Sequence, residues 1–92
     1  MKKEYILEPK EAFNMFRVPS NLEDLVNVLI SGILSDTQKK QDHFIKLAEV
    51  LSKNLNQYEI KYAQFKTVQI LNYIRVKNGL EPMDIMETLK DA

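Results

Sequence analysis

Hydrophobic residues recur along most of this chain at the spacing of an α-helix. Between positions 22 and 34, apolar side chains cover most of the helical circumference and leave a narrow polar strip: Asp24, Asn27, Ser31 and Ser35. From 44 to 55, apolar residues follow the i, i+3, i+4, i+7 spacing of a helix with one buried face. A helix that is apolar on most sides lies centrally in a bundle or at an oligomer interface. We therefore expect the 22–34 segment to lie between other helices.

Capping signals divide the chain into four main helices and a short fifth one. The predicted ranges are 9–17, 20–35, 37–55, 57–78 and 82–90. Two capping-box patterns support this division, Ser20 with Glu23 and Asn56 with Glu59. Asp36 is the predicted cap of the third helix, and Gly79 suits the left-handed position that ends the fourth. The prediction is one all-α domain spanning residues 1–92.

The residue inventory argues against catalysis and against bound metals or cofactors. The chain has no cysteine and a single histidine, His43, so thiolate and multi-histidine metal sites are excluded within one chain. Its two glycines are isolated and form no phosphate-binding loop, and no serine lies in a nucleophile elbow. His43 falls at the edge of an apolar face, where a packed ring is the simpler interpretation. We expect no enzyme activity, no cofactor and no small-molecule substrate.

Charge is distributed unevenly although the formal net charge is zero. Residues 37–79 contain eight basic and three acidic residues, whereas residues 80–92 contain one basic and four acidic residues. Lys39, Lys46 and Lys53 form a row along the third predicted helix. Asp42 with Lys46 and Glu49 with Lys53 are i, i+4 pairs that favour a solvated face over a binding stripe. Zero net charge and two long helices around a polar junction disfavour DNA binding.

The fourth predicted helix has two apolar-leaning faces. One is an ordinary core stripe of Ile60, Ala63, Thr67, Ile70, Leu71 and Ile74. The other is rich in tyrosines, which suit half-buried contacts. This second face packs inside the domain under the fifth helix, or it binds a partner. With the segment that follows it, the candidate partner-binding set is Tyr58, Tyr62, Phe65, Lys66, Gln69, Tyr73, Lys77, Leu80, Met83 and Met86.

The segment Glu59-Ile60-Lys61-Tyr62-Ala63-Gln64-Phe65-Lys66 resembles the opening of the last long helix in pediocin-like (class IIa) bacteriocin immunity proteins, especially the enterocin A immunity type. The runs 22–34 and 44–55 also look like the two middle helices of that family. The resemblance covers residues 20–79 and implies an antiparallel four-helix bundle, here with a short additional C-terminal helix. It also places specificity in the C-terminal half.

The function that the resemblance implies is protection of a bacteriocin producer. Such proteins act on the membrane mannose phosphotransferase receptor with bound bacteriocin, without catalysis. The implied location is cytoplasmic, with membrane association through the protein partner. Residues 1–10 do not predict a signal peptide, and the 22–34 run falls short of the ~20 residues that span a bilayer. Two alternatives stay open: a phage or mobile-element protein that inhibits a host protein, and a DNA-binding regulator. A homodimer also stays open.

Overall fold

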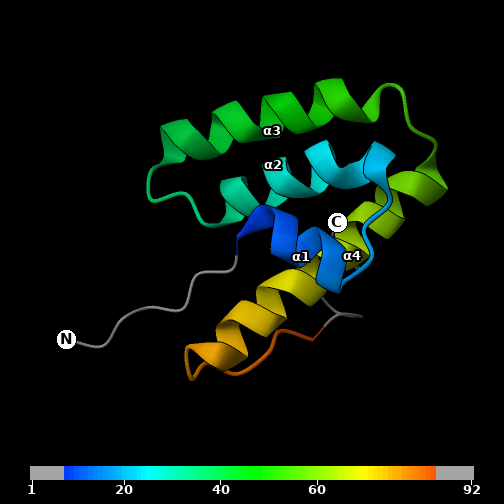
Figure 1. Cartoon of the computed structure of the whole chain (residues 1–92). Coiled ribbons are helices and arrows are strands. Elements are labelled where there is room, and N and C mark those ends of the chain that lie inside the picture. The colour runs from blue at the N-terminus through cyan, green and yellow to red at the C-terminus, as the bar shows by residue number, and fades with distance from the viewer. Residues whose placement is uncertain (1–7, 85–92) are drawn as a thin grey trace.

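Helices account for all the regular structure in the computed structural model, which describes residues 8–84 (Figure 1). Within this range there is no strand, so the all-α prediction is confirmed there. The elements in chain order are α1 (Pro9–Met15), a 3₁₀ turn (Ser20–Leu22), α2 (Glu23–Ile33), α3 (Gln38–Ser52) and α4 (Gln57–Lys77).

α2 lies between α3 and α4 and packs on both, as its nearly continuous apolar surface predicts (Figure 1). α2 approaches α3 closely at Gly32. A Cβ atom at this position would lie 3.2 Å from the Cβ of Phe44, tighter than ordinary van der Waals contact. The absence of a side chain at Gly32 therefore lets the two helices meet at this distance.

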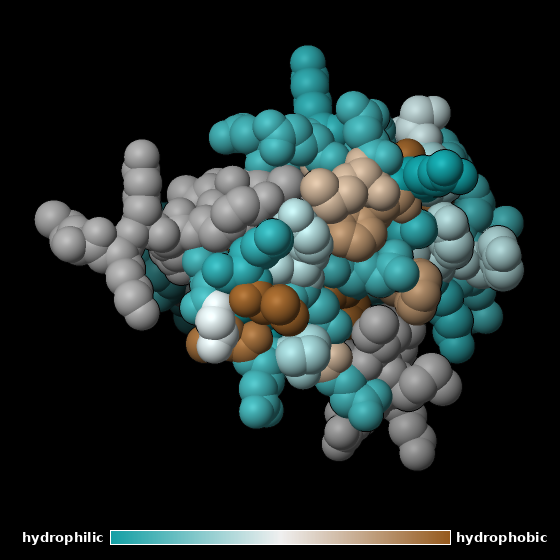
Figure 2. All heavy atoms as spheres, turned by 60° about the horizontal axis from the view of Figure 1, so that its bottom comes forward, coloured by the Kyte–Doolittle hydropathy of each residue, from teal (hydrophilic) through white to brown (hydrophobic). Residues whose placement is uncertain are grey.

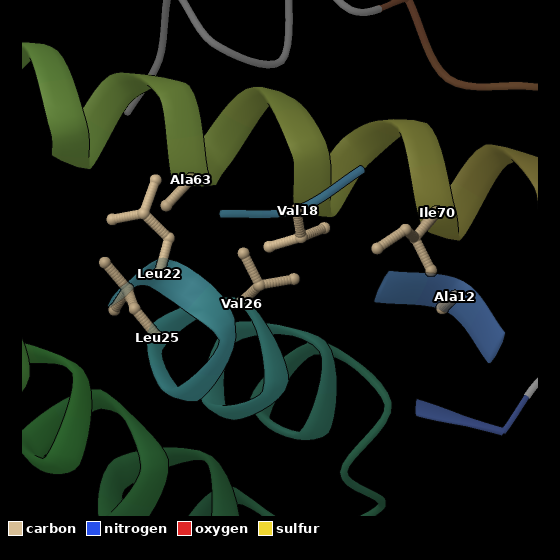
Figure 3. Close-up of a cluster of buried hydrophobic side chains, with 7 residues drawn as sticks. All are labelled: Ala12, Val18, Leu22, Leu25, Val26, Ala63 and Ile70. Carbon is tan, nitrogen blue, oxygen red and sulfur yellow. The ribbon is translucent and has the colours of Figure 1, made fainter. Parts of the chain in front are cut away.

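The hydrophobic core fills the space between α1, α2 and α4 (Figure 3). Val26 of α2 and Ile70 of α4 are its largest fully buried side chains. The cluster as a whole consists of Ala12, Val18, Leu22, Leu25, Val26, Ala63 and Ile70. Burial of such side chains is the main favourable term in folding, so this three-helix contact holds the domain together.

The predicted core face of α4 is largely confirmed. Ala63, Thr67, Ile70 and Leu71 are buried, while Ile60 and Ile74 are partly buried. Thr67 is the one buried polar residue of the described chain, and its Oγ1 donates a hydrogen bond to the Ala63 carbonyl at 2.8 Å. This bond satisfies the hydroxyl, so burial of Thr67 leaves no unpaired donor.

Of the three helix N-terminal caps predicted from the sequence, the structure confirms one. Asn56 and Glu59 form the predicted capping box, with hydrogen bonds of 2.8 and 3.1 Å. The predicted Ser20–Glu23 box is wrong, because Ser20 opens a 3₁₀ turn without a side-chain cap and α2 begins only at Glu23. The predicted Asp36 cap is also wrong. Thr37 caps α3 by accepting from the Lys40 amide at 3.2 Å, and Asp36 forms a salt bridge with Lys40 instead.

Two helices end in the same hydrogen-bonded motif. After α4, Gly79 has a φ of 80°, and the amides of Gly79 and Leu80 donate to the carbonyls of Val76 and Arg75. After α1, Arg17 has a φ of 52°, and the amides of Arg17 and Val18 donate to Asn14 and Phe13. Both are Schellman motifs with the left-handed residue at C′. The Gly79 prediction is confirmed.

The chain after Gly79 differs from the predicted fifth helix in the part that can be described. Residues 80–84 are not helical and run back beside the C-terminal half of α4 (Figure 1). The helical prediction for Pro82–Asp84 is therefore wrong. Its remaining residues, including Ile85, Met86 and Leu89, lie outside the described range.

Candidate functional site

An open apolar groove of about 850 Å³ lies between α2, α3 and the first turns of α4. Most of its lining residues belong to α2 and α3. The lining residues are Leu25, Val28, Leu29, Gly32, Ile33, Gln41, Phe44, Ile45, Ala48, Glu49, Ser52, Lys53, Ile60 and Gln64. Concave apolar sites with a few polar groups at the edge are the usual ligand-binding sites of proteins.

The groove is open because, among residues 8–84, α3 packs mainly on one neighbouring helix. α3 packs chiefly on α2, and none of its side chains is fully buried. Ile33 of α2 and Ile45 of α3 both line the groove, yet they are 56% and 54% exposed. Large apolar side chains gathered at a concave surface are a common mark of a protein-interaction site.

The edge of the groove on α3 is polar and carries both charges, Glu49 and Lys53. The predicted i, i+4 pairs of Asp42 with Lys46 and of Glu49 with Lys53 are not salt bridges in the described chain. Asp42 Oδ1 instead accepts a hydrogen bond from Gln38 at 2.9 Å. The α3 lysines are exposed, as the solvated-face interpretation predicts, but without those pairs.

The candidate residues predicted from the sequence lie elsewhere, along the opposite side of α4 and the segment after it. Tyr58, Lys77 and Leu80 are exposed, and Tyr58 is 78% exposed. Five α4 residues are partly buried, as is Met83 after the helix: Tyr62, Phe65, Lys66, Gln69 and Tyr73. Met86 lies outside the described residues. None of the described candidates lines the groove.

Aromatic contacts divide this face of α4 into two separate groups. The rings of Tyr58 and Tyr62 are parallel within 8° with centroids 6.4 Å apart, and Lys66 Nζ lies 5.4 Å from the Tyr62 ring. Near the other end of α4, Tyr73 meets Phe16 edge-to-face at 5.8 Å, and Lys77 Nζ lies 5.5 Å from the Tyr73 ring. Tyr62 and Tyr73 also pack against the core cluster. Much of this aromatic surface therefore contributes to internal packing.

The groove was missed because helical periodicity identifies an apolar face without showing how much of it is covered. The periodicity places Ile33 on the apolar surface of a central helix and does not distinguish Ile45 from its neighbours. The available signal was the run Phe44, Ile45, Leu47 and Val50, which is wider than one neighbouring helix covers.

The side chains of residues 8–84 do not group into a metal-binding site. No cluster of three or more His, Asp or Glu side chains there could hold a metal ion. His43 is exposed, and its ring meets Phe44 at a centroid distance of 5.6 Å. No helix in the same range combines the length and apolar character needed to cross a bilayer.

Comparisons of the chain with models of known protein families, with curated proteins and with solved structures find no match.

Proposed function

We propose that this chain works by binding another protein, and that the groove between α2, α3 and α4 is the contact surface. The observation that carries this proposal is the groove itself, about 850 Å³ in volume and bordered by exposed Ile33 and Ile45. An amphipathic helix of a partner could place its apolar face in such a groove, a common mode of peptide recognition. Residues of α2, α3 and α4 line the groove, so the three helices together form the proposed contact surface.

Within this class we propose a bacteriocin immunity protein of the pediocin-like type, folded as an antiparallel helical bundle. Support comes from the resemblance of residues 59–66 to the opening of the last long helix in that family. It also comes from the helical character of residues 8–84. The proposed partner is the mannose phosphotransferase membrane receptor with bound bacteriocin, met from the cytoplasmic side.

A protection assay tests this proposal. A strain sensitive to pediocin-like peptides expresses the wild-type chain, Ile45→Lys or Val50→Lys, and survival is measured against each peptide. Ile45 and Val50 are 54% and 57% exposed on the same helix, but Ile45 alone lines the groove. We expect protection by wild type and by Val50→Lys, and loss of most protection with Ile45→Lys. No protection by wild type against any such peptide would contradict the immunity proposal.

The predicted aromatic face is a competing contact surface, and Tyr58→Ala tests it. Tyr58 is highly exposed and lies outside the groove, so the groove proposal expects full protection by this variant. Lost protection with Tyr58→Ala and retained protection with Ile45→Lys would move the contact surface to α4. Circular dichroism of the purified variants verifies that each still folds.

A pull-down with the wild-type chain, from cells with and without added bacteriocin, identifies the partner. Recovery of a mannose transporter component that depends on the peptide would support the immunity proposal. Recovery of another host protein, lost with Ile45→Lys, would support the inhibitor alternative and retain the groove. Salt-sensitive retention on nonspecific DNA would support a regulator instead.

A further inference from the structure

The segment after α4 is held to the helix through its main chain. Asn72 makes two hydrogen bonds to the peptide groups of Met83: its Nδ2 donates to the Met83 carbonyl at 3.0 Å, and its Oδ1 accepts from the Met83 amide at 2.7 Å. One turn further along, Arg75 Nε donates to the Glu81 carbonyl at 2.8 Å. These three bonds use no side chain of the segment, so they would form with almost any sequence there.

The geometry of the contact is that of an extended peptide. Glu81 and Met83, two residues apart, both offer main-chain groups to α4, whereas these hydrogen bonds skip Pro82 between them. Such alternation is the period of an extended chain. As the segment runs from 81 to 83, its contacts move backward along α4 from Arg75 to Asn72.

The side of α4 that holds this segment continues beyond Asn72 toward the start of the helix. Gln69 precedes Asn72 by one turn, and its Oε1 is buried without a hydrogen-bond partner among the described residues. A buried acceptor without a partner costs free energy, and such an atom needs an explanation. An extended main chain that followed α4 for another turn would bring an N–H group toward this oxygen.

Charge indicates which peptides suit this edge. The cation on this edge is Arg75, which bonds to the Glu81 carbonyl, and the held segment carries the acidic residues Glu81 and Asp84. On the surface in Figure 2, hydrophilic residues predominate, with apolar patches between them. Opposite charges on α4 and on a bound peptide favour association and fix the register of the peptide.

We propose that Gln69, Asn72 and Arg75 form a binding site for an extended, acidic peptide segment, and that the chain's own residues 81–83 occupy the part of it at Asn72 and Arg75. A partner's extended segment takes their place by offering the same main-chain groups. The tether between α4 and Met83 is short, and short tethers give effective concentrations in the millimolar range. A partner therefore binds weakly until the chain's own segment is released. This site is distinct from the groove.

Nuclear magnetic resonance of the full-length chain tests the proposal. Met83→Pro removes the amide that donates to Asn72 Oδ1, whereas Met83→Ala keeps it and serves as the matched control. The probe is a capped peptide with the sequence of residues 79–84, and the signal followed is the side-chain amide of Asn72. We expect the Met83→Pro variant to bind the peptide at least ~10-fold more tightly than wild type or Met83→Ala, by release of the internal competitor.

A second substitution tests whether binding uses the proposed contacts. Asn72→Leu introduced into the Met83→Pro variant should abolish peptide binding, followed through the main-chain amide of Arg75. A probe with Gln and Asn in place of its Glu and Asp should bind several-fold more weakly. Equal affinity for the acidic probe and its neutral version would overturn the preference for an acidic peptide.

Three results would overturn the site itself. In the first, Met83→Pro binds no peptide. In the second, wild type, Met83→Ala and Met83→Pro all bind the peptide with the same affinity. In the third, the Met83 amide of wild type exchanges with solvent as fast as that of the free peptide. None of these readouts depends on bacteriocin protection or on Ile45, so this proposal and the groove proposal can fail independently.

Discussion

At the scale of single residues, Arg17 and Gly79 occupy the same position of the same motif with different chemistry. Both lie at C′ after a helix and both have positive φ, 52° for Arg17 and 80° for Gly79. A residue with a Cβ atom meets steric conflict in this region at a cost of about 1–2 kcal/mol, whereas glycine does not. The end of α1 therefore contains strain that the end of α4 avoids.

Arg17→Gly should stabilise the protein. Removing the Cβ conflict gains about 1–2 kcal/mol, and greater freedom of the unfolded chain offsets roughly half of this. Arg17 is exposed and its backbone bonds do not involve the side chain. We expect the free energy of unfolding to rise by about 0.5–1 kcal/mol, measured by urea denaturation with an unchanged m value. A fall in stability would show that the arginine side chain makes a favourable contact.

Gly79→Ala should have the opposite effect. A Cβ atom at this position would meet nothing within 4 Å, so any loss comes from backbone conformation rather than from crowding. We expect a loss of about 1 kcal/mol in the same urea experiment. An unchanged stability would mean that the chain after α4 adopts another turn at little cost.

At the scale of elements, α4 has the best-defined start of the described helices. Asn56 accepts from the Glu59 amide, and Glu59 Oε1 accepts from the Asn56 amide. The other carboxylate oxygen of Glu59 accepts from Asn21 Nδ2 at 2.9 Å, which ties the start of α4 to the turn before α2. The cap therefore fixes a tertiary contact as well as a helix end.

Asn56→Ala should lower stability by about 1 kcal/mol, the usual cost of losing such a cap. The neighbouring exposed residue Gln57 provides the control, and Gln57→Ala should stay within about 0.5 kcal/mol of wild type. Thermal denaturation by circular dichroism measures both. Equal stability of the two variants would indicate that water or Asn21 replaces the lost cap.

Local sequence signals predicted α4 better than its neighbours, for identifiable reasons. At Asn56 nothing competes with the cap, so the pattern and the structure agree. At Ser20 the following Leu22 is buried in the core, and a 3₁₀ turn places it there in preference to a capped α-helix. After Pro82, Asn72 holds the main chain of Met83 in a non-helical segment. These two mistaken predictions involve contacts outside the local pattern, whereas the mistaken Asp36 cap is a local difference, because the adjacent Thr37 caps α3 instead.

At the scale of the whole molecule, stability depends on the contact of α1, α2 and α4. Ile70 is 1% exposed in this contact and faces Ala12 of α1 (Figure 3). Ile70→Ala should reduce the free energy of unfolding by about 2–5 kcal/mol, through lost burial and a remaining cavity. The exposed Val76 on the same helix provides the control, and Val76→Ala should change stability by less than about 0.5 kcal/mol. A loss below about 1 kcal/mol for Ile70→Ala would place the core elsewhere.

The arrangement of helices was only partly predictable. The apolar stripe of α4 identified the core residue Ile70, because a stripe shows which side of a helix is buried. A stripe does not show which helices meet. The wide apolar run on α3 indicates uncovered surface, but not the location of the groove, which depends on α3 packing chiefly on α2 and leaving Ile45 exposed.

The lack of any buried side chain on α3 has a consequence for local unfolding. Segments with few buried contacts open at lower free energy than the core, and their amide hydrogens exchange sooner. The amides of α3 should thus exchange through a sub-global opening. The amides around Ile70 in α4 should exchange only when the whole domain unfolds. A partner held in the groove would slow exchange in α3 before it slows exchange elsewhere, so hydrogen exchange could reveal binding without knowledge of what is bound.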